Sequence, residues 1–585
     1  MKLRSPTVGL MALGCLSACH HPAPPEVAPI VDAAAARSHD ANSQLDEVVR
    51  EHIDASLAFS PTTASWLGVH TFDDRLDDPS PEAQLRELVR LQKVLARTAA
   101  ISDDELDANH RIDRLLIEHD VRLALIELET RPMDRNPLRY VDLVSSGIDE
   151  LLSREFAPLP DRLRSVDARL LRVRPLFDEA RRNLKSPPEL FTRRAIEMGQ
   201  SLRGFLTETL PSTVGAVADD KLLAEFRFAQ ADALRALDEF LLWLQRDLTP
   251  RSKGEYALGR ERLAERLRVG EGVEMPIEQL LALGEREMRT ARQRYEETAK
   301  IVLPGKPTAD AARSLDEDHA TAETLLPSTR EALESMADFV TKHHLATLPA
   351  LVPQVSEMPA FMWGFASMSM AGPLEPRARE ARFYVDPVDH AWNAAKREEH
   401  LRALNRPQLF VTALHEVIPG HFLQGESARA APSVMQRYAR SYVFVEGWAN
   451  YAEQMMLAEG FAAGDVKVRL AEQREGLVRI CRMVAVIRLH AMGAKLDDVA
   501  KLFADEALLD DYSAHREAER AAYDPMVLAH SLGRLQIAKL RDDVKAARGD
   551  GFKLGEFHDQ LLAHGAAPLS ILRGILLPGD TASTL

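Results

Sequence analysis

Two histidines and a glutamate lie close together in the segment His415-Glu416-Val-Ile-Pro-Gly-His421. Imidazoles are preferred zinc ligands, and a hydrolytic zinc site uses three protein ligands and leaves a fourth position for water. A glutamate beside that water can accept its proton as a general base. These residue types therefore indicate a hydrolytic zinc site in which His415 and His421 bind the metal and Glu416 is the base.

The spacing of the two histidines differs from the familiar arrangement, in which they lie four residues apart on one helix face. In a regular helix the present spacing would turn His421 about 120° away from His415 and about 9 Å along the axis. Pro419 cannot donate to the carbonyl of His415 and crowds that turn, so we expect the helix to open there. Gly420 then permits the backbone path that returns His421 to the site. The alternative is a helix end with two buried histidines, but the full pattern favours a metal site.

A third ligand is expected on a neighbouring helix. Glu446 begins the segment EGWANYAE, and it follows His421 at a distance that allows a turn and a returning helix. Asn450 and Glu453 share a helix face with Glu446. Glu446 is therefore the predicted third ligand, with Asn450 and Glu453 supporting the ligands from behind. For Glu453 a solvated or ion-paired carboxylate is the favoured alternative.

The N-terminus predicts export. Lys2 and Arg4 precede a largely apolar run, 7–16, which is too short to span a bilayer as a mature helix. The following Leu-Ser-Ala-Cys19 resembles the lipobox of bacterial lipoproteins, in which the cysteine is lipidated. We expect a signal peptide at 1–18, a lipid anchor on Cys19, and a location at the periplasmic side of the inner or outer membrane. An ordinary signal peptide with an incidental cysteine is the alternative.

The rest of the chain predicts a large helical protein. Residues 19–43 are rich in Pro, Ala and polar types, which is typical of a flexible tether. Apolar residues then recur at steps of three and four, as in 234–244 and 470–491, and indicate amphipathic helices. The clearest short strand is 381–386. The length suits an N-terminal lobe at 44–260 and a C-terminal lobe at 261–585 with the zinc site, or one continuous domain.

Composition narrows the expected partners. The chain has 73 basic and 89 acidic residues, and this net charge of −16 argues against nucleic acid as a partner. A peptide substrate and a membrane, reached through the lipid, remain as expected partners. If Cys19 carries lipid, Cys481 has no disulfide partner, and its apolar helical surroundings predict a buried side chain.

The motifs together resemble a known family. The segments HEVIPGHFLQ and EGWANYAE, with a later segment at 532–537, are similar to the bacterial family called domain of unknown function 885. Its members are mostly α-helical and are often described as zinc metallopeptidases. The resemblance implies a mainly α fold with little β structure and a gluzincin-like active-site cleft. It also implies that His415, His421 and Glu446 bind the metal, with Glu416 as the base. We expect about one zinc ion per chain, the usual stoichiometry of such sites.

Departures from the family pattern concern groups that would act on the transition state. Relatives tend to carry a tyrosine where this chain has His530-Ser531, and an aspartate where it has Val486. A donor at that tyrosine position could stabilise a tetrahedral oxyanion, and His530 could take this role. His558 is expected to be architectural. The second-rank catalytic candidates, each with an equally good structural explanation, are His530, Arg534 and His490.

Three functions are compatible with these residues. The leading hypothesis is peptide-bond hydrolysis, in which Glu416 takes a proton from a zinc-activated water and passes it to the leaving amine. The second is a catalytically inactive lipoprotein that binds peptides or a protein partner, although a purely structural zinc site needs no base. The third is hydrolysis of another amide or an ester at the same site.

Overall fold

The computed structural model describes residues 40–359, 362, 364–376, 380–580 and 582–585. The predicted signal peptide, the predicted lipidation site Cys19 and residues 19–39 of the predicted tether lie outside the described residues. Helix α1 (Ala41–Phe59) begins inside the range predicted as tether. The prediction is wrong for Ala41–Ser43 because the apolar side chains of α1 are buried from its first residues, Ala41 and Leu45, onward.

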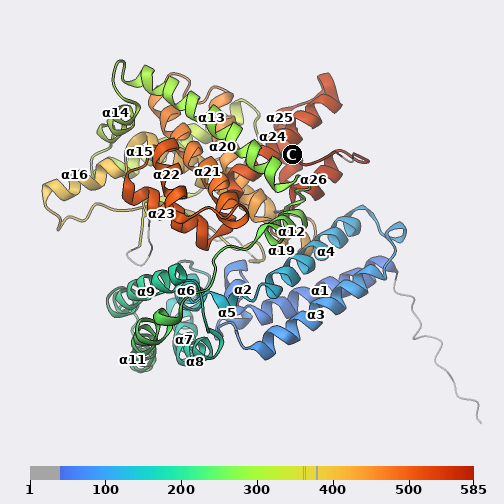
Figure 1. Cartoon of the computed structure of the whole chain (residues 1–585), viewed down its shortest axis with the longest axis vertical. Helices are drawn as coiled ribbons and strands as arrows, with labels where there is room; N and C mark the ends of the chain where they lie inside the picture. The colour runs from blue at the N-terminus through green and yellow to red at the C-terminus, as the bar shows by residue number, and fades with distance from the viewer. Residues whose placement is uncertain (1–39, 360–361, 363, 377–379, 581) are drawn as a thin grey trace, which may run out of the picture. The chain divides into compact units, whose positions relative to one another are not determined.

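Helices account for 71% of the chain and strands for 3%, which confirms the predicted mainly α fold (Figure 1). The helices that follow α1 in the first half of the chain are α2 (Pro61–Leu67), α3 (Pro81–Ala99), α4 (Ala108–Glu129), α5 (Pro132–Arg135), α6 (Leu138–Leu152), α7 (Leu159–Leu170), α8 (Val173–Asn183), α9 (Glu189–Gly204), α10 (Leu210–Val214), α11 (Asp220–Trp243), α12 (Arg260–Glu271) and α13 (Ile277–Val302).

The second half of the chain continues in the same way. Its helices are α14 (Thr308–Arg313), α15 (Leu325–Lys342), α16 (Ala394–Ala403), α17 (Arg406–Glu416), α18 (His421–Arg429), α19 (Val434–Tyr438), α20 (Tyr442–Ala458), α21 (Val466–Ala491), α22 (Leu496–Glu506), α23 (Asp511–Tyr523), α24 (Ala529–Arg548), α25 (Leu554–Leu562) and α26 (Leu569–Leu576). The helical patterns at 234–244 and 470–491 fall largely on α11 and α21, which confirms them.

A small sheet interrupts the helices between α15 and α16. Its strands are β1 (Gln354–Glu357), β2 (Ala366–Ser369) and β3 (Arg382–Val385), in the order β1-β3-β2. Strand β1 runs parallel to β3 and β2 runs antiparallel to it, so that Phe383 lies opposite both Val355 and Met368. Strand β3 is the one predicted at 381–386; its last three residues are buried, and Phe383 is buried completely.

Three hydrophobic clusters hold the helices together within Ala41–Leu585, which form one compact unit. One cluster joins α1, α3 and α4 to α17, α18, α20 and α24, and it includes Leu45 and Phe422. A second is built on α13 and α21–α23 and contains Cys481, which is fully buried as predicted. A third lies within α6–α11. The division into lobes near residue 260 stays a prediction.

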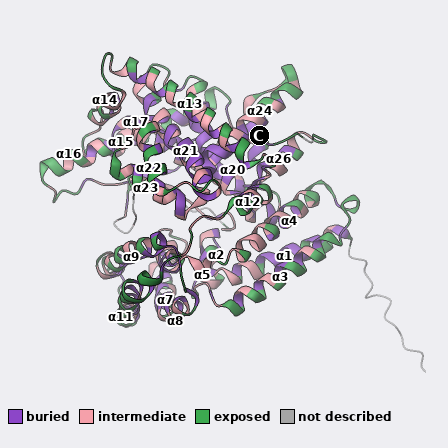
Figure 2. Cartoon of the chain, in the orientation of Figure 1, coloured by how far each residue is buried: buried purple, intermediate pink, exposed green. Residues whose placement is uncertain are grey.

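Helix α20 is buried along most of its length, as Figure 2 shows for the region of α20 and α21. It packs closely against α24 because glycines face each other: a Cβ added to Gly447 would lie 2.4 Å from the Cα of Gly533. Any larger residue would force the two helices apart. This approach brings Glu446 of α20 next to His530 of α24. Among the described residues, no helix combines the length and apolar character needed to cross a membrane.

Candidate metal centre

The helix that carries the first histidine stops where the sequence predicts. Helix α17 ends at Glu416 and α18 begins at His421, and the Ile418–Pro419 peptide bond between them is cis. Gly420 is required by space, since a Cβ there would lie 1.8 Å from the carbonyl oxygen of His415. The indole Nε1–H of Trp448 donates to the carbonyl of Pro419 at 2.9 Å, which ties the break to α20. The two histidine rings consequently lie 4.7 Å apart.

The three predicted ligands meet around one point. Glu446 Oε2 lies 3.8 Å from His415 Nε2 and 3.6 Å from His421 Nε2. One donor atom from each of the three residues lies within 4.8 Å of the others. Two imidazoles and one carboxylate on a partly enclosed site are a donor set that zinc accepts in hydrolytic enzymes. The residues therefore fit the metal that the sequence predicts.

A buried ion pair orients the first ligand. His415 Nδ1–H donates to Glu453 Oε1 at 2.5 Å, which directs Nε2 toward Glu446. Arg479 Nη1 donates to the two oxygens of Glu453 at 2.8 and 2.7 Å, and the Glu453 side chain has no exposed surface. Glu453 is thus ion-paired, as its favoured alternative states. It is also hydrogen-bonded to the predicted ligand His415, an arrangement that is common behind metal-binding histidines in proteins.

Asn450 contacts the ion pair of Glu453 and Arg479 without contacting the predicted ligands themselves. Its Oδ1 accepts from Arg479 at 3.3 Å and its amide donates to the carbonyl of His530 at 3.2 Å. Arg479 itself is a positioning residue that the sequence prediction missed. The available signal was chemical: a glutamate on a buried helix face needs a counter-charge, and Arg479 lies between the apolar residues Val478 and Ile480 of α21.

The charges in the cluster shift the pKa values of its members. Burial and the nearby Arg479 oppose the charged form of His415, but hydrogen bonds to Glu446 and Glu453 outweigh them and raise its pKa to about 9. Burial disfavours the charged form of Glu446 as well, yet three imidazoles hold its pKa well below the usual range. A cation that binds here therefore competes with a proton.

His530 contacts a ligand rather than the open pocket. Its Nε2 lies 3.0 Å from Glu446 Oε2, and burial lowers its pKa to about 4. Its Nδ1 is buried and has no hydrogen-bond partner among the described residues. The contact makes His530 a positioning residue for Glu446. Its role as an oxyanion donor stays a prediction.

Arg534 does not join the cluster. Its Nη1 donates to Gln454 Oε1 at 3.3 Å, and its Nη2 lies 3.6 Å from Glu287 on α13. It lines a separate pocket with both residues. These partners hold the guanidinium away from the predicted ligands. The structural explanation of Arg534, as a contact between helices, is therefore the one that the structure supports.

The two remaining histidines are also engaged elsewhere. His490 donates from Nε2 to a backbone carbonyl of α23 at 2.9 Å and accepts at Nδ1 from a backbone N–H before α12 at 3.2 Å. His558 accepts at Nε2 from the hydroxyl of Tyr451 at 2.9 Å and donates from Nδ1 to a backbone carbonyl at 2.6 Å. Both rings therefore connect helices, as expected for His558, and neither is brought to the ligands.

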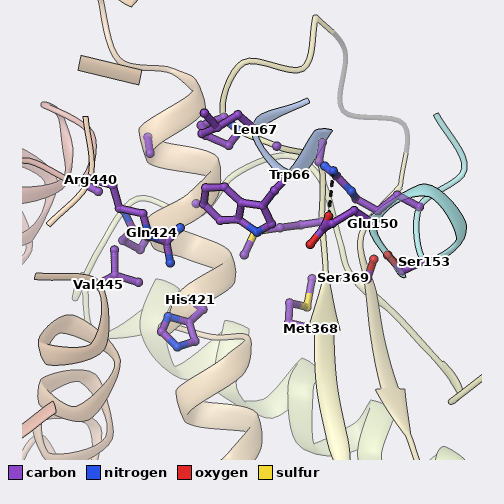
Figure 3. A pocket seen from close by; sticks show the side chains of 18 of the residues that line it. Trp66, Leu67, Glu150, Ser153, Met368, Ser369, His421, Gln424, Arg440 and Val445 are labelled. Carbon is purple, nitrogen blue, oxygen red and sulfur yellow. Dashed lines mark hydrogen bonds and ion pairs between the residues drawn. The ribbon is translucent and has the colours of Figure 1, made fainter. Parts of the chain in front are cut away.

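A pocket of about 320 Å³ opens beside the ligands, and Glu416, His421 and Glu446 line it. The sequence did not point to the rest of its lining, which comes from distant parts of the chain. Figure 3 shows these side chains, among them Trp66 of α2, Glu150 of α6 and Ser369 of β2. No local spacing connects such residues, so only the fold shows that they belong to one pocket.

The fold and the site thus define a helical protein with a two-histidine, one-glutamate cluster, two members of which line a pocket. Residues 61–576 match the family described as "Bacterial protein of unknown function (DUF885)", and the chain belongs to this family, as its motifs predicted. No curated protein matches the chain.

Two solved structures share the fold. One is titled as a "putative lipoprotein of unknown function" from Shewanella oneidensis, with 24% identity, a TM-score of 0.75, and coverage of 91% of this chain and 99% of that one. The other is titled as a "putative lipoprotein" from Colwellia psychrerythraea, with 16% identity, a TM-score of 0.76, and coverage of 92% and 98%.

Proposed function

We propose that this protein is an exported zinc-dependent hydrolase that cleaves peptide bonds. One observation carries the proposal. His415, His421 and Glu446 place donor atoms within 4.8 Å of one another, and Glu416 lines the same pocket as two of them. A purely structural zinc site is closed by four protein ligands, whereas a catalytic one has three ligands and access to a pocket.

The chain supplies each part of a hydrolytic reaction. A zinc ion held by the three ligands would act as a Lewis acid toward the scissile carbonyl and the attacking water. Glu453 and Arg479 keep the His415 ring turned toward the metal position. Glu416 accepts the proton from the water and delivers it to the leaving amine, so its carboxylate is needed in both steps.

The predicted cleft and the envelope location belong to the same proposal. The pocket beside Glu416 serves as the substrate cleft of a gluzincin-like peptidase. A lipid on Cys19 would hold the protein at the membrane while the body remains in the periplasm. The lipobox-like residues before Cys19 support this anchor, and so do the lipoprotein titles of the two structures that share the fold.

The test compares wild type with Glu416→Gln on a broad peptide library, together with metal analysis of each protein. We expect the variant to keep its zinc, because Glu416 is not a ligand, and to lose roughly 10²- to 10⁴-fold in turnover, because its base is gone. Glu399→Gln, which removes an exposed carboxylate of α16, is the matched control and should cleave like wild type.

Unaltered turnover in Glu416→Gln would contradict the mechanism. Failure of the wild type to cleave any peptide in a zinc-dependent way would favour the catalytically inactive binding protein. Cleavage of other amides or esters, but not of peptides, would favour the third function considered from the sequence.

A further inference from the structure

Arg440 is held rigidly at the entrance to the helix that carries Glu446. Its backbone forms a parallel bridge with Ala566, and the next residue, Ser441, donates from its N–H to the carbonyl of Ala566 at 2.7 Å. Ser441 is also the N-cap of α20, and its hydroxyl accepts from the N–H of Phe444. These contacts fix the backbone of Arg440 relative to Glu446.

The guanidinium of Arg440 lies over an aromatic ring and has no anionic partner. Its Cζ is 4.4 Å from the centre of the Trp66 ring, a cation–π contact. Within the described part of the chain, its guanidinium makes no ion pair or hydrogen bond. The neighbouring Arg154 differs, since its Nη2 donates to Glu150 at 3.2 Å in the same pocket. Arg440 is thus a preorganised cation with its donors unused.

The surroundings of Arg440 are those of a cavity wall. Its side chain has solvent-accessible surface, yet the dense protein around it lowers the pKa of the guanidinium by burial, which the charge of Glu446 partly offsets. Both hold for an exposed side chain that lines a pocket open to solvent. A cation bound by the three ligands would occupy the carboxylate of Glu446 and leave Arg440 without that nearby negative charge.

Gln424 completes the arrangement. It is only 5% exposed, and within the described residues its side-chain amide has no hydrogen-bond partner. It lines the same pocket as Arg440 and His421, and Figure 3 shows its side chain near that of Arg440. Its amide atoms are not among the buried unpartnered atoms of the described residues, so the amide is accessible from the pocket and can bond to a ligand there. Two adjacent donor groups, one of them charged, therefore face the pocket beside the metal ligands.

We propose that Arg440 and Gln424 bind a carboxylate of the substrate, and that the hydrolytic site therefore prefers peptides that present a carboxylate near the scissile bond. A guanidinium matches a carboxylate with two parallel hydrogen bonds, and stacking on Trp66 keeps its plane in place. The carboxylate is either the C-terminus of the peptide or the side chain of an Asp or Glu. This proposal rests on the proposed function, since it concerns the substrate of that site.

The experiment measures peptide binding and cleavage separately. The probes are Ala-Ala-Ala-Ala as the free acid, the same peptide as its C-terminal amide, and an amide-capped peptide with one internal Glu. Binding is measured by calorimetry on zinc-loaded Glu416→Gln, which does not consume the peptide, and kcat/KM is measured on wild type. We expect the free acid to exceed the plain amide by roughly tenfold or more in both. If the amide-capped peptide with an internal Glu binds and is cleaved as well as the free acid, the carboxylate that the site recognises is that of a side chain.

The variants assign this preference to Arg440. In the Glu416→Gln background, Arg440→Gln should bind the acid and the amide equally, and Arg440→Lys should keep part of the preference because it keeps the charge but not the fork. Arg437→Gln is the matched control: it removes the same charge from the same pocket, but the Arg437 Nε–H is already used on the carbonyl of Ser433. This control should keep the full preference.

The outcomes separate the two proposals. Equal binding of acid and amide by the zinc-loaded protein, or an acid preference that survives in Arg440→Gln, would overturn the carboxylate site. An acid preference in binding without any cleavage would contradict only the proposed function. If Arg440→Gln does not fold, Arg440→Lys and Gln424→Glu take its place, and Gln424→Glu should reverse the preference by charge repulsion.

Discussion

The pocket has two kinds of lining, and they differ in how their polar groups are satisfied. The ligand wall (Glu416, His421 and Glu446) comes from α17, α18 and α20 and is backed by a buried network through Glu453 and Arg479. The N-terminal wall (Trp66, Leu67, Glu150 and Ser153) comes from α2, α6 and the residue that follows α6. In the first wall Glu446 lies close to three imidazoles, whereas the second wall presents an aromatic ring and the partly buried carboxyl group of Glu150.

Under the proposed function, this difference assigns the two walls different tasks. Hydrolysis requires groups fixed in position, which a satisfied buried network provides. Recognition requires surface that a substrate can cover, such as the accessible parts of the half-buried Trp66 and Ser153. Variants of the buried network behind the ligand wall should therefore change metal binding and stability together, while variants of the N-terminal wall should leave the metal in place.

The largest effect is expected for Glu453→Gln. This variant leaves the buried Arg479 without its counter-charge, which should lower the free energy of unfolding by about 3 to 5 kcal/mol. It also weakens the bond that orients His415, and zinc affinity should fall about 10- to 100-fold. Chemical denaturation and a competition assay with a zinc chelator measure the two quantities.

Glu459→Gln is the control for charge, because Glu459 is exposed at the C-terminal end of the same helix. If Glu453→Gln binds zinc as tightly as wild type, the network behind His415 does not contribute to metal binding. The proposed difference between the two walls would then be wrong.

A smaller, pH-dependent effect is expected on the N-terminal wall. Burial raises the pKa of Glu150 to about 7, against the opposing charge of Arg154. Because this folded-state pKa lies above the ordinary value of 4.5, the associated stability is complete below about pH 4.5 and declines as the pH rises through about 7. Between pH 5 and 8 the ionisation of Glu150 should lower the unfolding free energy of wild type by up to about 3 kcal/mol. Glu150→Gln cannot ionise and should not show this decrease.

Unfolding free energies of Glu150→Gln and wild type at the two pH values measure this difference, and zinc content should be the same in both proteins. Parallel pH profiles would mean that Glu150 is not held protonated by the fold. A loss of zinc in Glu150→Gln would show that Glu150 contributes to metal binding, which would contradict its assignment to the N-terminal wall.

The smallest effect is expected for Trp448→Phe. The substitution removes the Nε1–H donor from the buried carbonyl of Pro419 and should cost about 1 to 2 kcal/mol of unfolding free energy. Zinc should remain bound, with weaker affinity, because only the anchor of the helix break is lost. An unchanged stability would show that α20 does not hold the break in place.

The sequence predicted the ligand wall because its information is local. The break between His415 and His421 follows from Pro419 and Gly420, and the face shared by Glu446 and Glu453 follows from helical periodicity. The small strand β3 and the long helix α21 were likewise predictable from short-range apolar patterns.

The remaining features depend on contacts between distant segments. Trp66 lies far from Arg440 in the sequence, and only tertiary packing places the ring against the guanidinium. Arg534 and His490 have the right chemistry for a catalytic role, but their partners on other helices hold them away from the ligands. Residue type and spacing do not specify which of several polar side chains on α21 and α24 faces the site.

The most direct measurement is the zinc content of the purified soluble body of the protein, in wild type and in His421→Ala. The proposed site predicts about one zinc per chain in the wild type. It predicts little or none in His421→Ala, with a folded helical protein by circular dichroism in both. A wild-type protein that binds no zinc, or a His421→Ala protein that binds as much as wild type, would contradict the proposal that His415, His421 and Glu446 form a metal centre.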